Sequence, residues 1–310
     1  MRVRRFKRDV CNHVYQRTID RFNIFYDAID YLVYFTIFSV CASKYKVTVL
    51  GLCLMIDHIH TLVTASCKNV LSNFISNVTS VFVREYNYSL TRKGPLFEKR
   101  FGSAPKMDKK RLMSAIIYLG NNPVEKQVCS RAEQYQWNFL AYMKSDNPFS
   151  APISEKISED LKRALGVVDW YHASGKYLNH TLLWNLWKKL SEHEARQLAD
   201  YIVVKYNVID YSELKSYFGS YEQMVLSMHS TTGSEYDLKE HVDRFSDATY
   251  REMIKCVTPS MAGICRRVIL LPTSSKYELL MHLHASTGAS PTQLRKFLHL
   301  KENPRELGHH

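Results

Sequence analysis

The chain lacks any apolar run as long as the roughly 18 residues that a membrane-spanning helix needs. The run from Leu50 to Ile56 is short and stops at Asp57, and the basic N-terminus is not followed by an apolar stretch of the signal-peptide type. The 310 residues are 45% apolar and 12% aromatic, enough to build the core of one large domain or of two ordinary ones. We therefore expect a globular, cytoplasmic protein that does not enter a membrane.

Cysteine pairs at metal-binding or redox spacing are also missing. The seven cysteines are odd in number, scattered, and never form a Cys-x-x-Cys pair. Neither a disulfide framework nor a cysteine zinc site is indicated, so we expect reduced cysteines in the core. No internal repeat or low-complexity tract is visible.

Acidic residues are scarce in the first half of the chain. Residues 1–150 hold 22 Lys and Arg against 11 Asp and Glu, a net charge of +11, whereas residues 151–310 carry only +1. A basic half of this kind indicates a polyanionic partner, most simply nucleic acid. The alternative is that the charge merely keeps the protein soluble.

The order of apolar patterns predicts an α+β domain over residues 1–148. Strands are expected at 10–18, 47–54 and 59–64, with a further short strand after the loop at 94–101. Helices are expected at 26–43, 69–87 and 109–122; Asp108 caps the last one and Pro123 ends it. This alternation is typical of an antiparallel sheet covered by helices.

Residues 149–310 show only helical patterns, and we expect an all-α C-terminal domain there. The predicted helices are 157–165, 182–190, 192–206 and 211–218. Residues 276–300 have the spacing of a helix-turn-helix, in which Ser290 and Pro291 open the second helix. This pair either contacts DNA or packs as ordinary helices, and the sequence leaves both readings open.

The triplet His58-Ile59-His60 carries the clearest chemical signal. Two imidazoles one residue apart on a strand point to the same face and can share one metal ion, and Tyr118 and Asn122 share a face of the predicted helix. A tyrosine hydroxyl, with a pKa of about 10, is a poor nucleophile at neutral pH, so a cation that polarises a phosphate makes its attack feasible. We predict Tyr118 as the nucleophile and His58, His60 and Asn122 as ligands of Mg²⁺ or Mn²⁺.

Four ordered blocks resemble the single-tyrosine HUH transposases, and within them the branch of REP-associated tyrosine transposases. The blocks are Val49 to Val63, Gly94 to Phe101, Tyr118 to Val124, and Gln134 to Asn138, so the resemblance covers roughly residues 10–145. It implies an RRM-like, or ferredoxin-like, catalytic fold. It also implies cleavage of single-stranded DNA, often beside a hairpin, through a covalent 5′-phosphotyrosine at Tyr118 that conserves the bond energy for rejoining.

Two positions depart from the family pattern. Ile56-Asp57 stands where the family usually has Pro-Asn, and a carboxylate beside the imidazoles can orient one of them or compete for the metal. Asn138 stands where the family commonly has Ser. Neither change removes a catalytic group.

Several cations are candidates for DNA contact. They are Arg92, Lys93, Lys99, Arg100, Lys109, Lys110 and Arg111, followed by Arg295 and Lys296 on the second helix of the helix-turn-helix. Cations in the first turn of a helix oppose its dipole and are better tolerated beside a phosphate, although three solvated side chains explain them equally well. The alternative to a strand transferase is a catalytically inactive DNA-binding or regulatory protein on the same fold. The sequence leaves open whether the protein is a monomer or a homodimer.

Overall fold

The first half of the chain folds around a four-stranded antiparallel sheet. We analysed a computed structural model that describes residues 5–98, 100–230, 246–261 and 263–301, so Lys99 lies outside the described residues. The strand order is β2-β3-β1-β4. The strands are β1 (Asn12–Arg17), β2 (Thr48–Met55), β3 (His58–Thr64) and β4 (Gly102–Pro105). The predicted α+β fold with an RRM-like antiparallel sheet is confirmed.

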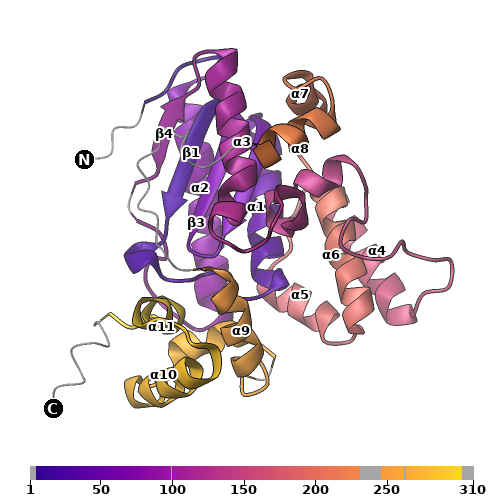
Figure 1. Cartoon of the computed structure of the whole chain (residues 1–310). Helices are drawn as coiled ribbons and strands as arrows, with labels where there is room; N and C mark the ends of the chain where they lie inside the picture. The colour runs from indigo at the N-terminus through magenta and orange to yellow at the C-terminus, as the bar shows by residue number, and fades with distance from the viewer. Residues whose placement is uncertain (1–4, 99, 231–245, 262, 302–310) are drawn as a thin grey trace.

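Helices cover both faces of this sheet. The helices α1 (Ala28–Tyr45) and α2 (Lys68–Ser89) pack against each other on one face, and α3 (Lys109–Glu125) lies across the other (Figure 1). Because side chains alternate along a strand, β3 sends Ile59 towards α1 and the two histidines of the triplet towards α3. Leu119 of α3 packs on Gly51 of β2, whose missing side chain leaves room for that contact.

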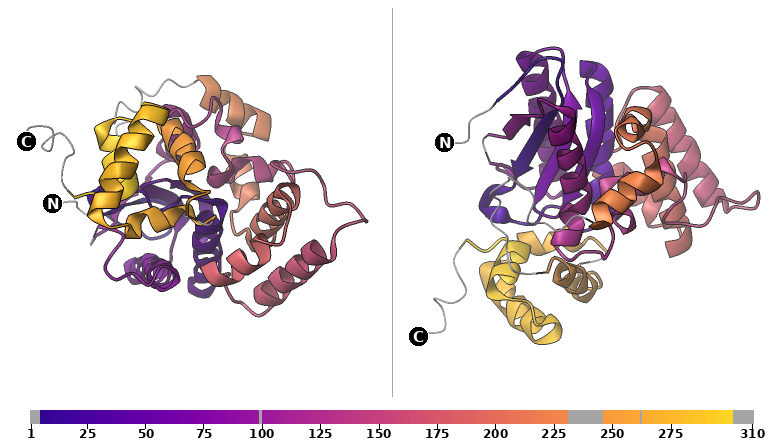
Figure 2. Two further views of the ribbon diagram at one scale, coloured as in Figure 1. Left: turned by 90° about the horizontal axis from the view of Figure 1, so that it is seen from below. Right: turned by 45° about the horizontal axis from the view of Figure 1, so that its top comes forward.

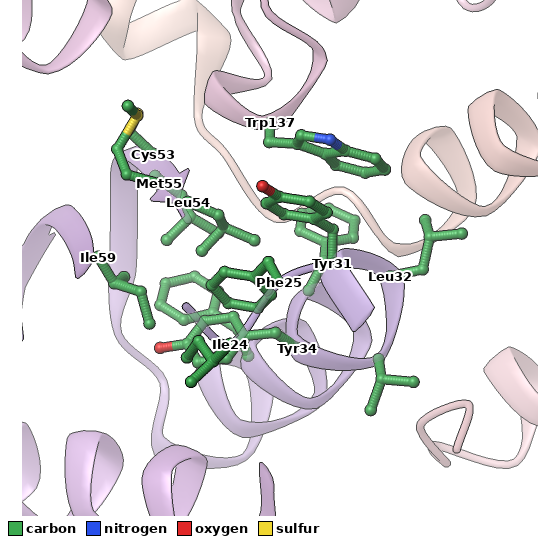
Figure 3. Close-up of a cluster of buried hydrophobic side chains, with 14 of the residues drawn as sticks. Ile24, Phe25, Tyr31, Leu32, Tyr34, Cys53, Leu54, Met55, Ile59 and Trp137 are labelled. Carbon is green, nitrogen blue, oxygen red and sulfur yellow. The ribbon is translucent and has the colours of Figure 1, made fainter. Parts of the chain in front are cut away.

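The helix α1 is buried on almost every side. It begins at a capping box, in which Asp27 Oδ1 accepts from the Asp30 amide at 3.1 Å. Its Tyr31 ring stacks on Trp137 with the ring centres 4.5 Å apart and the planes parallel within 1°. Figure 3 shows this stack beside Phe25. The helix thus contributes to the core between the sheet and the loop that follows α3.

The helix α3 runs further than predicted. It begins as expected, where Asp108 Oδ1 accepts from the Arg111 amide at 2.8 Å, but it continues through Pro123 to Glu125 instead of ending at Asn122. Proline only disfavours helical geometry in the residue before it. Here Pro123 is buried and the Lys126 amide donates to the Asn122 carbonyl at 3.1 Å, so helical hydrogen bonding resumes past the proline.

Beyond residue 148, the described residues form helices joined by loops, as predicted. The helices are α4 (Glu159–Ala173), α5 (His180–Trp187), α6 (Glu192–Tyr206), α7 (Tyr211–Ser216), α8 (Tyr221–Ser230), α9 (Ala248–Val257), α10 (Thr273–Thr287) and α11 (Pro291–Leu298). The sequence patterns missed α8 and α9. Gly288, with φ +64°, ends α10 in the left-handed region, and Ser290 caps α11, so the helix-turn-helix shape is present.

These later helices contact the first half in three places, one of which is formed by α7 and α8 against β2 and α3. The helices α5 and α6 lie beside α1, with α4 packed on α6, while α9 to α11 lie under the end of the sheet that holds the turn between β2 and β3 (Figures 1 and 2). The buried apolar side chains of both halves form one connected core, so the domain boundary at 148/149 stays a prediction. Within the described residues, no helix is both long and apolar enough to cross a membrane.

Candidate active site

The strand β3 sets the two histidines of the triplet side by side. His58 pairs with Arg17 of β1 and His60 pairs with Tyr15, so these four side chains share the face that α3 covers. The rings of His58 and His60 are nearly perpendicular, with centres 5.0 Å apart, and both are buried. The strand therefore brings both imidazoles to one place under α3.

The helix α3 brings the predicted tyrosine and amide to the same place. Asn122 Oδ1 lies 3.1 Å from His58 Nε2, and Asn122 Nδ2 donates to Tyr118 Oη at 3.3 Å. The Tyr118 ring meets His60 edge to face, with centres 5.4 Å apart. One amide thus joins an imidazole of the strand to the phenol of the helix, and the four residues converge.

Asp57 lies in the turn between β2 and β3 and holds His58. Its carbonyl accepts from both the amide and the hydroxyl of Thr18 at 3.0 Å, while its Oδ1 accepts from His58 Nδ1 at 2.5 Å. Burial raises the pKa of Asp57, but the charge and hydrogen bond of His58, with the charges of Lys296 and Arg21, hold it well below its usual range. The ionised carboxylate is placed to orient the imidazole.

A third imidazole, which the sequence analysis missed, supports His60. Nε2 of the buried His13 lies 3.0 Å from His60 Nδ1, and the two rings stack with centres 5.1 Å apart. Burial lowers the pKa of His60 well below its usual value, and the electrostatic effects of His58, His13, Arg17 and Lys126 act in the same direction. His60 is therefore a neutral imidazole, the form that binds metal ions. Only the pairing of β1 with β3 reveals His13.

The donor set fits a hard divalent cation. Adjacent ligands about 2.1 Å from an octahedral ion are about 3.0 Å apart, which agrees with the 3.1 Å between His58 Nε2 and Asn122 Oδ1. Nδ1 of each imidazole already faces a partner, so Nε2 is the nitrogen for the metal. No group of three or more His, Cys, Asp or Glu side chains forms a metal site in the part of the chain that the structure describes. The mixed set of two imidazoles and one amide leaves positions for phosphate oxygens.

Comparison with known proteins finds a family match in the first part of the chain. The model of the family described as "Transposase IS200 like" matches residues 7–119, which include the strands of the sheet, the histidine triplet and Tyr118. Residues 7–119 are therefore similar to the IS200-like transposases. A solved structure described as "Structure of the REP associates tyrosine transposase bound to a REP hairpin" resembles it with a TM-score of 0.41 and 11% identity, over 51% of this chain and 94% of that one. No curated protein matches the chain.

This match confirms the transposase resemblance and supports a transposase-like DNA-binding function. The cations predicted to contact DNA fall into two groups. Lys93, Arg100, Lys109, Lys110 and Arg111 are exposed. Arg92, by contrast, is half-buried and braces its own loop, because it donates to Asn87 Oδ1 at 2.5 Å and to the carbonyls of Gly94 and Pro95.

The two cations predicted on the second helix of the helix-turn-helix face the transposase domain. Arg295 of α11 donates to the Asp20 carbonyl at 3.1 Å and lies over the Phe22 ring. Lys296 is buried, with its Nζ 3.7 Å from Asp57 Oδ2. DNA contact by this pair of cations stays a prediction, whereas their contacts with the first half of the chain are present in the structure.

Proposed function

We propose that this protein is a DNA nicking and joining transposase that uses Tyr118 as its nucleophile. His58, His60 and Asn122 would hold Mg²⁺ or Mn²⁺. The observation that supports this most is the double contact of the Asn122 amide, whose oxygen faces His58 Nε2 at 3.1 Å and whose nitrogen donates to Tyr118 Oη at 3.3 Å. A metal ligand and a nucleophile are thereby held by one rigid group on one helix.

The reaction that fits these groups is a transfer of one phosphodiester bond. A bound divalent cation would polarise the oxygens of the scissile phosphate and offset its charge. Tyr118 Oη loses its proton and bonds to phosphorus, while the bond from phosphorus to the 3′-oxygen breaks and that oxygen leaves as a 3′-hydroxyl. The 5′-phosphate stays on the tyrosine until a 3′-hydroxyl reverses the step. Asn122 Nδ2 keeps Oη directed and stabilises it as it becomes negative.

Positive side chains around the site support a DNA substrate. Arg17 and Lys126 are half-buried; Arg17 pairs with His58 across the two strands, and the Lys126 amide donates to the Asn122 carbonyl at 3.1 Å. The exposed cations at the start of α3 extend this positive region outwards, within a half of the chain that carries +11. We propose single-stranded DNA beside a hairpin as the substrate, which the sequence resemblance to REP-associated transposases supports.

Denaturing gels with end-labelled DNA test this proposal. The protein is incubated with Mn²⁺ and a library of single-stranded hairpin oligonucleotides, labelled at the 3′ end because that fragment stays on the tyrosine. We expect a covalent protein–DNA adduct that disappears with EDTA and with Tyr118→Phe. The matched control is Tyr88→Phe, which changes an exposed tyrosine of α2 and should leave the adduct unchanged. Adducts that persist in Tyr118→Phe would exclude Tyr118 as the nucleophile.

A second candidate function is DNA binding without catalysis. The burial of Tyr118, which is only 3% exposed, favours it, because a nucleophile must reach its phosphate. In that case no member of the library yields an adduct, and DNA binding survives both EDTA and combined substitution of His58, His60 and Tyr118. Affinity alone cannot separate the two candidates, since both predict salt-sensitive binding.

A further inference from the structure

The last described helix is fixed to the segment that connects β1 to α1. The Asn23 amide donates to the Lys296 carbonyl at 3.2 Å, and Tyr26 Oη donates to the Phe297 carbonyl at 2.6 Å. His299, which follows α11, donates from Nε2 to the Asn23 carbonyl at 2.6 Å. These bonds use backbone groups on both sides, so α11 has a defined position against the transposase domain (Figure 2, left).

That position directs one lysine at the turn before the histidine triplet. Lys296 Nζ lies 3.7 Å from Asp57 Oδ2, and the two side chains are only 8% and 10% exposed. The other oxygen of the same carboxylate, Oδ1, accepts from His58 Nδ1 at 2.5 Å. The Asp57 carboxylate is therefore held between a histidine of its own strand and a lysine of the C-terminal helix.

A lysine at this place is not explained by packing alone. Lysine is almost never buried unless it is paired, and an apolar side chain of similar volume is often as good or better for stability at a buried ion pair. The ammonium group of Lys296 instead orients the Asp57 carboxylate. It attracts Oδ2 and so fixes the rotation of the carboxylate, which keeps Oδ1 on Nδ1 of His58 and turns Nε2 towards Asn122.

We propose that Lys296 is a positioning residue of the active site, through which the C-terminal helices fix Asp57 and with it the imidazole of His58. This inference rests on the proposed metal-binding role of His58. The helices α9 to α11 would then help to position a residue of the catalytic site, whether or not they contact DNA themselves. The removal of this unit would then impair the chemistry as well as the docking of substrate.

Three variants test the role of Lys296. Lys296→Met removes the charge at nearly the same length, Lys296→Arg keeps it, and Arg295→Met is the matched control, because it releases a neighbouring anchor of α11 that does not touch Asp57. The first readout is the His58 Nδ1–H proton resonance in the metal-free protein, which a hydrogen bond as short as 2.5 Å moves far downfield. The second is the dissociation constant for Mn²⁺, measured by electron paramagnetic resonance.

We expect Lys296→Met to shift or broaden the His58 resonance and to raise the Mn²⁺ dissociation constant roughly three- to tenfold. This is less than the 10–100-fold typical of direct partners of metal ligands, because Lys296 acts one step further away and the charge of Arg21 also acts on Asp57. Lys296→Arg should restore most of both readouts, and Arg295→Met should change neither. If Lys296→Met does not fold, Lys296→Gln replaces it.

The inference is overturned if the charge-removing variant keeps the wild-type resonance and Mn²⁺ affinity, or if Arg295→Met changes them equally. The metal-free resonance separates this result from a failure of the proposed function. A wild-type protein that forms no adduct but loses its His58 resonance in Lys296→Met would refute the catalytic proposal and retain the positioning role.

Discussion

Removal of either partner from the buried ion pair between Asp30 and Arg266 should destabilise the protein strongly. Asp30, at the start of α1, is 0% exposed. Its Oδ1 accepts from Arg266 Nη1 at 2.5 Å and from His180 Nε2 at 3.2 Å, and its Oδ2 accepts from the Tyr26 amide at 2.9 Å. Arg266 lies 236 residues further along the chain, so this pair joins the C-terminal helices to the transposase domain.

The expected loss in unfolding free energy depends on whether a substitution leaves a buried charge without its partner. Removing one partner of a buried pair costs about 3–5 kcal/mol, because the other charge stays buried. Arg266→Met should therefore lower the free energy of unfolding by about 3–5 kcal/mol. Asp30→Asn should fall at the lower end of that range, since Asp27 remains 4.0 Å from Arg266. With both partners changed, neither Asp30 nor Arg266 leaves the other's charge buried, so the double variant should cost about 2–3 kcal/mol less than the sum of the two.

Urea unfolding followed by circular dichroism and tryptophan fluorescence measures this double-mutant cycle. The matched control is Arg163→Met, which breaks an exposed pair with Asp160 at 3.0 Å and should cost less than about 1 kcal/mol. The reasoning is refuted if the losses in unfolding free energy of the two single variants add up to that of the double variant within about 0.5 kcal/mol. It is also refuted if Arg266→Met destabilises the protein no more than Arg163→Met does.

Two further predictions concern buried polar groups. Burial and the charge of Arg266 lower the pKa of His180 from 6.5 to about 4, so this residue contributes stability above pH 6.5 that is lost as the pH falls towards 4. When the pH is lowered from 7 to 5, the free energy of unfolding measured by urea titration should thus fall by about 2 kcal/mol less in His180→Gln than in the wild type. Equal decreases in the two proteins would contradict the assignment. Asn138→Ser, which introduces the residue common in the family, removes the 2.7 Å donation to the Ala132 carbonyl and the 3.1 Å contact with the Leu140 amide. It should lower the unfolding free energy by about 1–3 kcal/mol, and an unchanged urea midpoint would show that a shorter side chain serves equally well.

The sequence predicts those elements whose apolar side chains follow a regular period. The strand β2 and the helix α6 fall within a residue or two of their expected places for that reason. The helix α9 buries only three large side chains, Tyr250, Met253 and Val257, which is too few to stand out in the sequence. The short strand β4 is defined by its pairing, since Gly102 lies beneath Tyr15, whose ring carbon Cζ would be 2.0 Å from an added Cβ.

The site residues that the sequence could predict are likewise those grouped by local spacing, whereas the others depend on contacts between distant segments. Two histidines two apart on a strand, and a tyrosine and an asparagine four apart on a helix, share a face whatever the rest of the fold does, so their grouping follows from spacing. His13 depends on how two strands pair, and Lys296 depends on where a distant helix docks. Lys296 was a candidate for DNA contact because it lies on the second helix of the predicted helix-turn-helix, and the position of Asp57 explains its burial.

The contact between Lys296 and Asp57 also bears on how the protein is made. A ribosome that adds roughly 5–20 residues per second needs about 10–35 s to extend the chain from Asn122 to Lys296. During that interval the sheet and α3 can fold with His58, His60 and Tyr118 already in the chain, while the brace on Asp57 has not yet been synthesised. The nascent transposase domain therefore holds every proposed catalytic group before it holds the helix that we propose fixes the orientation of His58.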